Sequence, residues 1–170
     1  MVIQSQQELF LLQLAQMYDV EQKLLQILPQ LAQETYYHQA HQAFSEHEQE
    51  TRQHVSNIEK CFQLLGYQPI VIENHAVSGL KEDHDAFAQQ EPPQKILTLF
   101  DLDVGRQCEY LEMALYQSLL ETAQMLGYQQ CLPLLQENLQ QEMAAAQKLA
   151  TIAHQLGTQS VQGMQGVQGA

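Results

Sequence analysis

Glutamates interrupt four long amphipathic runs at positions where an apolar residue is expected. In each run the apolar residues recur at intervals of three and four, which is the spacing of the inward face of an α-helix. The interruptions are Glu21, Glu50, Glu112 and Glu142. A carboxylate on an inward face loses its hydration, so it must be protonated, paired with a cation or bound to a metal ion. None of the seven Lys and Arg residues lies on these faces, and the sequence therefore favours a divalent metal ion as the partner.

The four runs predict an all-α protein with four long helices. They cover about residues 4–33, 37–65, 94–127 and 130–157. The connection near residues 33–37 is short, and so is the turn at Gly127-Tyr128. Each pair of helices should therefore form an antiparallel hairpin.

A long crossover should join the two hairpins. Gly66 and Pro69 mark the end of the second helix, and Pro92-Pro93 opens the third. A short helix is predicted within residues 78–89 of this crossover. Two antiparallel hairpins with such a connection predict a ferritin-like four-helix bundle.

The bundle should form a single domain over residues 1–157, and the Gln/Gly-rich residues 158–170 should form a disordered tail.

Composition restricts the cellular setting. The net charge of −13 argues against nucleic acid and anionic membranes as partners, because both require basic patches. No run approaches the roughly 20 apolar residues of a membrane span, and residues 1–7 lack the features of a signal peptide. These observations predict a cytoplasmic protein.

The two halves of the chain look like versions of one unit. Glu50 follows Glu21 by 29 residues, and Glu142 follows Glu112 by 30. Each hairpin should therefore present one carboxylate per helix at a matching depth. Aligning Glu50 with Glu142 places His54 opposite Ala146, which predicts that an imidazole is available on one side of the site only.

A mixed set of carboxylates and imidazole suits two divalent ions, with iron as the first choice and manganese as the alternative. Glu50 and His54 are one helical turn apart, and so are Glu109 and Glu112. His47 is an alternative to His54 as the imidazole ligand, and Glu109 is either a ligand or a proton acceptor beside the ligands. The five other histidines are expected to be solvated. The predicted ligands are Glu21, Glu50, His54, Glu109, Glu112 and Glu142.

Four stretches of the chain, residues 18–24, 43–55, 109–116 and 135–142, contain these carboxylates and histidines. Together they resemble the YciE/YciF-like family of bacterial stress proteins, and the resemblance extends over about residues 5–156. It implies a ferritin-like fold, metal bound by the helix glutamates and association as homodimers. Members often have an acidic residue where this chain has Ala146, which implies that metal binding on that side is either weaker or completed by water.

Two classes of function follow. The first is stress protection through peroxide or dioxygen chemistry at a di-iron or di-manganese centre, which would be an oxidase or peroxidase type of activity. The alternative is a metal-sequestering or structural dimeric stress protein without turnover. Sequence alone leaves both open.

Overall fold

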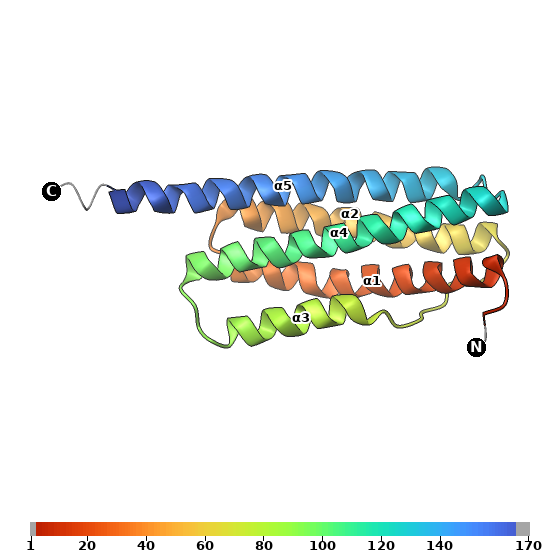
Figure 1. Ribbon diagram of the computed structural model, residues 1–170, viewed down its shortest axis with the longest axis horizontal. Coiled ribbons are helices and arrows are strands. Elements are labelled where there is room, and N and C mark those ends of the chain that lie inside the picture. The colour runs from red at the N-terminus through yellow and green to blue at the C-terminus, as the bar shows by residue number, and fades with distance from the viewer. Residues whose placement is uncertain (1–2, 166–170) are drawn as a thin grey trace.

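The structure, a computed structural model, describes residues 3–165, with side chains described up to residue 159. Within this range it is all-α and contains no strand. Four long helices form the bundle, and a shorter one lies in the crossover (Figure 1). The helices are α1 (Gln6–Glu34), α2 (His38–Leu64), α3 (His75–Ala88), α4 (Gln94–Leu126) and α5 (Leu132–Gln165).

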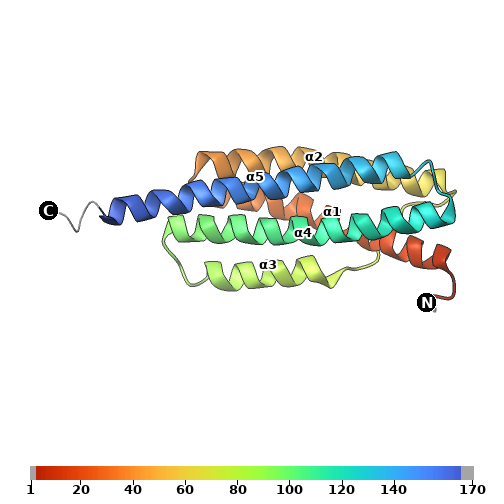
Figure 2. The same ribbon diagram turned by 45° about the horizontal axis from the view of Figure 1, so that its top comes forward.

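The helices pair as the sequence predicts. α1 packs on α2 and α4 packs on α5, and each pair is an antiparallel hairpin (Figure 1). Contacts of α1 with α4 and of α2 with α5 join the hairpins into one bundle. The crossover helix α3 lies along the outside of this bundle, against α1 and α4 (Figure 2). The ferritin-like architecture is therefore confirmed.

Local sequence signals set the ends of these helices. Ser5 and Glu8 form a reciprocal capping box at the start of α1, which satisfies backbone N–H groups that have no partner within the helix. Gly66 and Gly127 follow α2 and α4 with positive φ angles of 82° and 72°. Glycine is favoured there because it has no side chain to clash in the left-handed conformation.

α5 is longer than the sequence predicts. It continues to Gln165, whereas the bundle was expected to end at residue 157 and a disordered tail to follow. Glutamine is a good helix former, and Gly157 and Gly163 each weaken a helix by only about 1 kcal/mol, so the low-complexity composition did not require a break. Residues 166–170 of the expected tail lie outside the described residues.

Polar contacts fix the start of the crossover on α1. The Lys23 ammonium donates to the backbone carbonyl of Asn74 over 2.7 Å, and the backbone N–H of Asn74 donates to Asp19 Oδ2 over 2.8 Å.

On the inner side of α4, a Cβ atom at Gly105 would lie 3.1 Å from both Leu149 Cδ1 and Phe44 Cε1, so glycine permits close helix packing there. Among the described residues, none of the helices combines the length and apolar character that crossing a bilayer requires.

Candidate metal centre

Six ionisable side chains meet in the interior of the bundle, where all four long helices contribute. Each of the six has at most 5% of its surface exposed. They form two groups whose ligand atoms lie within 4.8 Å of one another, and Glu142 belongs to both groups. The contributing residues are Glu21 from α1, His47 and His54 from α2, Glu109 and Glu112 from α4, and Glu142 from α5.

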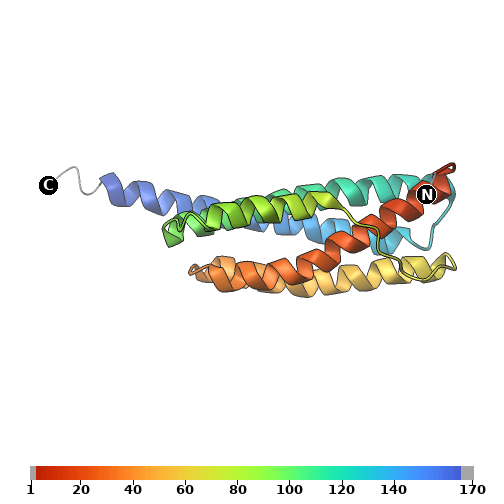
Figure 3. The ribbon, with the colours of Figure 1, turned by 90° about the horizontal axis from the view of Figure 1, so that it is seen from below.

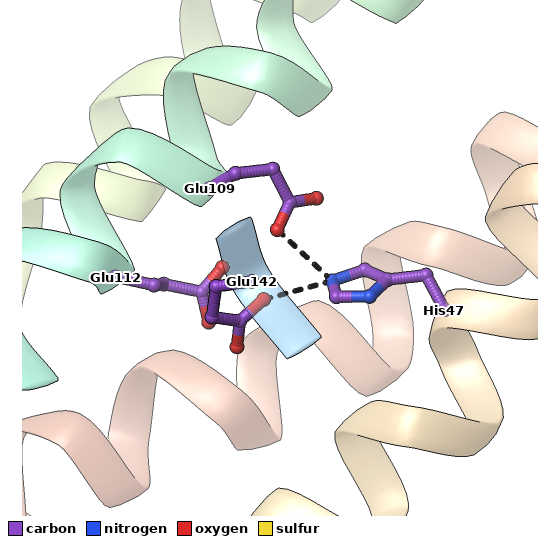
Figure 4. A group of neighbouring side chains, drawn as sticks. All are labelled: His47, Glu109, Glu112 and Glu142. Atoms are coloured by element: carbon purple, nitrogen blue, oxygen red, sulfur yellow. Dashed lines mark ion pairs between the residues drawn. The ribbon is translucent and has the colours of Figure 1, made fainter. Parts of the chain in front are cut away.

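The first group contains His47, Glu109, Glu112 and Glu142 (Figure 4). His47 Nε2 lies 3.3 Å from Glu109 Oε2 and 3.5 Å from Glu142 Oε2. The side chains of Glu109 and Glu112 extend from α4 towards His47 on the opposite side of the bundle (Figure 4). This group offers one imidazole nitrogen and three carboxylates to a single ion.

The second group contains Glu21, His54 and Glu142. His54 Nδ1 lies 2.9 Å from Glu142 Oε1 and 3.4 Å from Glu21 Oε1. Glu142 therefore faces the first group with one carboxylate oxygen and the second with the other. A carboxylate in this position can bridge two divalent ions.

Each histidine is held at the ring nitrogen that faces away from its group. His47 Nδ1 lies 3.2 Å from Glu50 Oε2, and His54 Nε2 lies 2.8 Å from Gln141 Oε1. Such partners fix the orientation of a metal-binding imidazole and leave the other nitrogen free to bind. Both histidines of α2 therefore point to the centre. The sequence left open which of the two is the imidazole ligand, and the structure makes both available.

Glu50 lies apart from both groups. Its side chain is 42% exposed, although the sequence predicted it as a direct ligand. The buried position of this turn is taken by Thr51, whose hydroxyl donates to the His47 carbonyl over 2.9 Å. One residue corresponds to about 100° of helical rotation, which is enough to move Glu50 from the inward face to a position beside His47.

The predicted asymmetry between the two halves does not describe these groups. Aligning Glu50 with Glu142 suggested one imidazole on one side only. In the structure each group includes one imidazole from α2, and Ala146 is in neither group. The remaining difference is that the first group has four members and the second has three.

Many polar atoms of the centre are buried without a hydrogen-bond partner. They include both oxygens of Glu112 and Glu142 and one oxygen each of Glu21 and Glu109. His47 Nε2 and His54 Nδ1, the two nitrogens that face the carboxylates, also lack one. Buried polar groups in proteins are nearly always paired. The unpaired atoms are oxygen and imidazole nitrogen ligands, so the donor set fits divalent iron or manganese.

The pKa values show how this centre is charged without a metal. Burial raises the pKa of Glu112 well above its ordinary value, and neighbouring carboxylates raise it further. Burial also raises the pKa of Glu142, to about 7, although His54 opposes this. Burial alone would lower the pKa of His54, but Glu21 and Glu142 raise it to about 10. Protons therefore occupy the centre where metal ions would otherwise balance the charge.

A buried chain of hydrogen bonds supports one side of the centre. The Tyr116 hydroxyl donates to Glu21, and Asn138 Nδ2 donates to that hydroxyl over 2.8 Å. Asn57 Nδ2 in turn donates to Asn138 Oδ1 over 2.7 Å. Neither asparagine was predicted from the sequence. Asn138 precedes Glu142 by one turn, so its position on the same helical face was the available signal.

A pocket of about 180 Å³ reaches the first group from the surface. His47 and Glu109 lie at its inner end, and Glu50 and Lys148 also line it. Three alanines from α2 and α5 keep it open: Ala43, Ala144 and Ala145. A small molecule such as peroxide or dioxygen could therefore approach the group that contains His47.

Replacing Glu112 with leucine should stabilise the metal-free protein. Both oxygens of Glu112 are buried and unpaired, and an unsatisfied buried polar group costs about 1–3 kcal/mol. We expect an increase of that size in the free energy of unfolding, measured by denaturant titration with a chelator present. The same variant should lose the additional stability that Mn²⁺ gives through the first group.

Glu121→Leu is the matched control because Glu121 is exposed on the same helix. It should change stability by no more than about 0.5 kcal/mol. A Glu112→Leu protein that is less stable than wild type in chelator would show that Glu112 stabilises the metal-free fold. That result would contradict the prediction that Glu112, as a metal ligand, lowers the stability of the metal-free protein.

Solved structures of proteins from several bacteria have the same fold. YcfI from Rhodopseudomonas palustris is 28% identical with a TM-score of 0.86, over 88% of this chain and 95% of that one. The stress protein YciF from Escherichia coli has a TM-score of 0.87 at 24% identity, over 92% and 99%. A protein from Xanthomonas campestris, XCC3681, has a TM-score of 0.73 at 18% identity, over 94% and 98%. The last two likenesses concern the fold alone.

Sequence comparison agrees with the structural likeness. Protein YciF of Escherichia coli strain K12 is 26% identical over 148 residues, which cover 86% of this chain and 89% of that protein. The resemblance to YciF-type stress proteins that the helix motifs suggested is thus confirmed. Residues 5–162 match the family described as Domain of unknown function (DUF892), and the chain belongs to this family.

Proposed function

We propose that the protein is a dimetal carboxylate protein that acts in the stress response by reducing peroxide or dioxygen. The observation that carries this proposal is the position of Glu142, whose two oxygens face two buried ligand groups, each with one imidazole. The first ion would be held by His47, Glu109, Glu112 and Glu142, and the second by Glu21, His54 and Glu142. Iron suits this donor set best and manganese is the alternative.

The residues around the centre have separate tasks in this proposal. When bound, two ferrous ions supply one electron each, and together these electrons and two protons reduce one peroxide molecule to water. Glu50 orients His47 and connects it to the pocket, where protons can enter from solvent. Tyr116 and Asn138 hold Glu21 in place on the far side.

The pocket gives peroxide or dioxygen a route to a ligand group, which turnover requires in addition to metal binding. YcfI, a relative provisionally described as a structural protein, nevertheless makes a role without turnover the natural competitor. Association as a homodimer and a cytoplasmic location stay predictions from the sequence.

The test separates metal binding from chemistry. Protein loaded anaerobically with Fe²⁺ should hold two ions and should consume about one peroxide per pair of ions as they are oxidised. Ala144→Leu, at the exposed side of the pocket, should keep both ions and slow peroxide consumption at least about tenfold, since it narrows the approach. Ala114→Leu, on an exposed part of α4, is the control and should behave like wild type.

Three results would count against the proposal. Protein without bound metal in the ferrous experiment would indicate a structural role for the buried acids. Two tightly bound ions that do not react with peroxide or dioxygen would indicate sequestration. Equal rates in wild type and Ala144→Leu would show that the pocket is not the route to the centre.

A further inference from the structure

A third buried histidine lies away from this centre, where the crossover helix meets the bundle. His84 of α3 is 1% exposed, so the prediction of a solvated side chain is wrong. It contacts two carboxylates from different helices, Glu34 in the last turn of α1 and Asp101 of α4. Together the three residues offer ligand atoms that lie within 4.8 Å of one another. Figure 3 shows that α3 runs alongside the bundle helices, and it contacts α1 and α4.

One nitrogen of His84 faces both carboxylates. His84 Nε2 lies 2.9 Å from Asp101 Oδ1 and 3.6 Å from Glu34 Oε2. The other nitrogen, Nδ1, lies 3.2 Å from Asp85 Oδ1. The second oxygen of Glu34 accepts a hydrogen bond from Gln30 Nε2 over 2.7 Å. Neighbouring side chains therefore hold the imidazole and the Glu34 carboxylate on their outer sides.

Two oxygens that belong to this group have no hydrogen-bond partner. They are Asp101 Oδ2 and Glu34 Oε2, and both atoms are buried. Asp101 itself is fully buried. An unpaired oxygen on a fully buried carboxylate is rare in proteins, and a bound cation is a partner that would satisfy it.

The arrangement repeats the one found in the central site. There, His47 is held by Glu50 and His54 by Gln141 at the nitrogen that faces away from the ligands. Asp85 is in the same position relative to His84, so it can keep the proton on Nδ1 and leave the lone pair of Nε2 directed at the carboxylates.

We propose that Glu34, His84 and Asp101 bind one divalent transition-metal ion of the zinc type, which fastens α3 to α1 and α4. One imidazole and two carboxylates are a donor set that zinc accepts, and tetrahedral coordination leaves a fourth position for water. The Glu34 side chain is 30% exposed, so that water and the entering ion can reach the group from solvent. This site is independent of the central one and shares no residue with it.

The competing explanation is an ion-pair network in which a protonated His84 balances the carboxylates without metal. Zn²⁺ counting by equilibrium dialysis on the intact protein separates the two. Asp101→Asn should bind one zinc ion fewer than wild type. Asp83→Asn is the matched control, because Asp83 is exposed on the same helix as His84, and it should bind as many ions as wild type.

A second measurement follows the crossover directly. Zinc should slow hydrogen exchange of the α3 amides in wild type and in Asp83→Asn, but not in Asp101→Asn. If Asp101→Asn fails to fold, Glu34→Gln replaces it, because this side chain is partly exposed at the end of a helix. A full complement of zinc in the folded variant would overturn the proposal and leave the ion-pair network. Loss of ions from the central groups lowers the total in wild type and in Asp101→Asn alike and leaves the difference of one ion between them unaffected, so the two proposals fail separately.

Discussion

Replacing Glu142 with alanine should remove both metal ions from the centre of the bundle. Of the described residues, Glu142 alone belongs to both ligand groups, and each of its oxygens faces a different one. Loss of a partner that only orients a ligand typically weakens metal binding 10–100-fold. Loss of a bridging ligand should therefore weaken the binding of both ions more than about 100-fold. Equilibrium dialysis with Mn²⁺, followed by metal analysis, measures the effect.

Two other variants make this result specific. Glu21→Gln and Glu112→Gln each alter a residue of one group only, so each should lose one ion and keep the other. Glu121→Ala removes the same charge from an exposed position and should keep both ions. If Glu142→Ala keeps one ion at wild-type affinity, Glu142 does not bridge the two groups.

Periodicity and turn residues were sufficient to predict the bundle. Apolar residues at intervals of three and four locate the inward faces, and Gly66 and Gly127 end helices where a positive φ is needed. The same periodicity correctly places Glu21, Glu112 and Glu142 in the interior. These predictions succeed because they depend on the repeat of one helix and on residues close together in the chain.

The errors arise where a single step of the register matters. His47, Glu50 and His54 fit a stripe with intervals of three and four, but so do His47, Thr51 and His54. Sequence spacing cannot distinguish the two stripes, and only packing against α1 and α5 shows that Thr51 is buried. Glu50 therefore contacts His47 Nδ1 from outside the two ligand groups.

Contacts between distant segments were equally beyond the sequence. The spacing of Asn138 from Glu142 puts it on the inward face of α5, but its contact with Asn57 exists only once α2 and α5 are placed together. His84 reads as a solvated residue of a connection, because nothing in the pattern of a short helix shows which bundle helices it covers. Its burial against Asp101 depends on the path of the whole crossover.

Affinity for divalent metal at the central site should rise steeply between pH 6 and pH 8. In the metal-free protein, the pKa of Glu142 is raised to about 7 and that of His54 to about 10, and burial raises the pKa of Glu112 and Glu21 as well. Two imidazolium groups and two protonated carboxyls would make the set of four carboxyls and two imidazoles neutral. Two divalent ions on fully deprotonated ligands are also neutral. Metal binding should therefore displace about four protons.

The sign of the pH dependence follows from this exchange. Groups whose pKa is raised retain their protons at pH 6, so metal ions must compete with them. As the pH rises, fewer protons need to be displaced. Each displaced proton changes the affinity about tenfold per pH unit. Because Glu142 titrates within the interval, we expect the affinity for each ion to increase on average at least about tenfold per pH unit.

Mn²⁺ titrations at pH 6, 7 and 8 measure this slope, and calorimetry in buffers of different ionisation enthalpy counts the released protons. Glu112→Gln should release about one proton fewer, since it removes a carboxyl whose pKa lies well above its ordinary value. An affinity that does not change with pH would show that the bound ions do not contact the buried carboxyls and imidazoles, and the central site would then have to be placed elsewhere in the molecule.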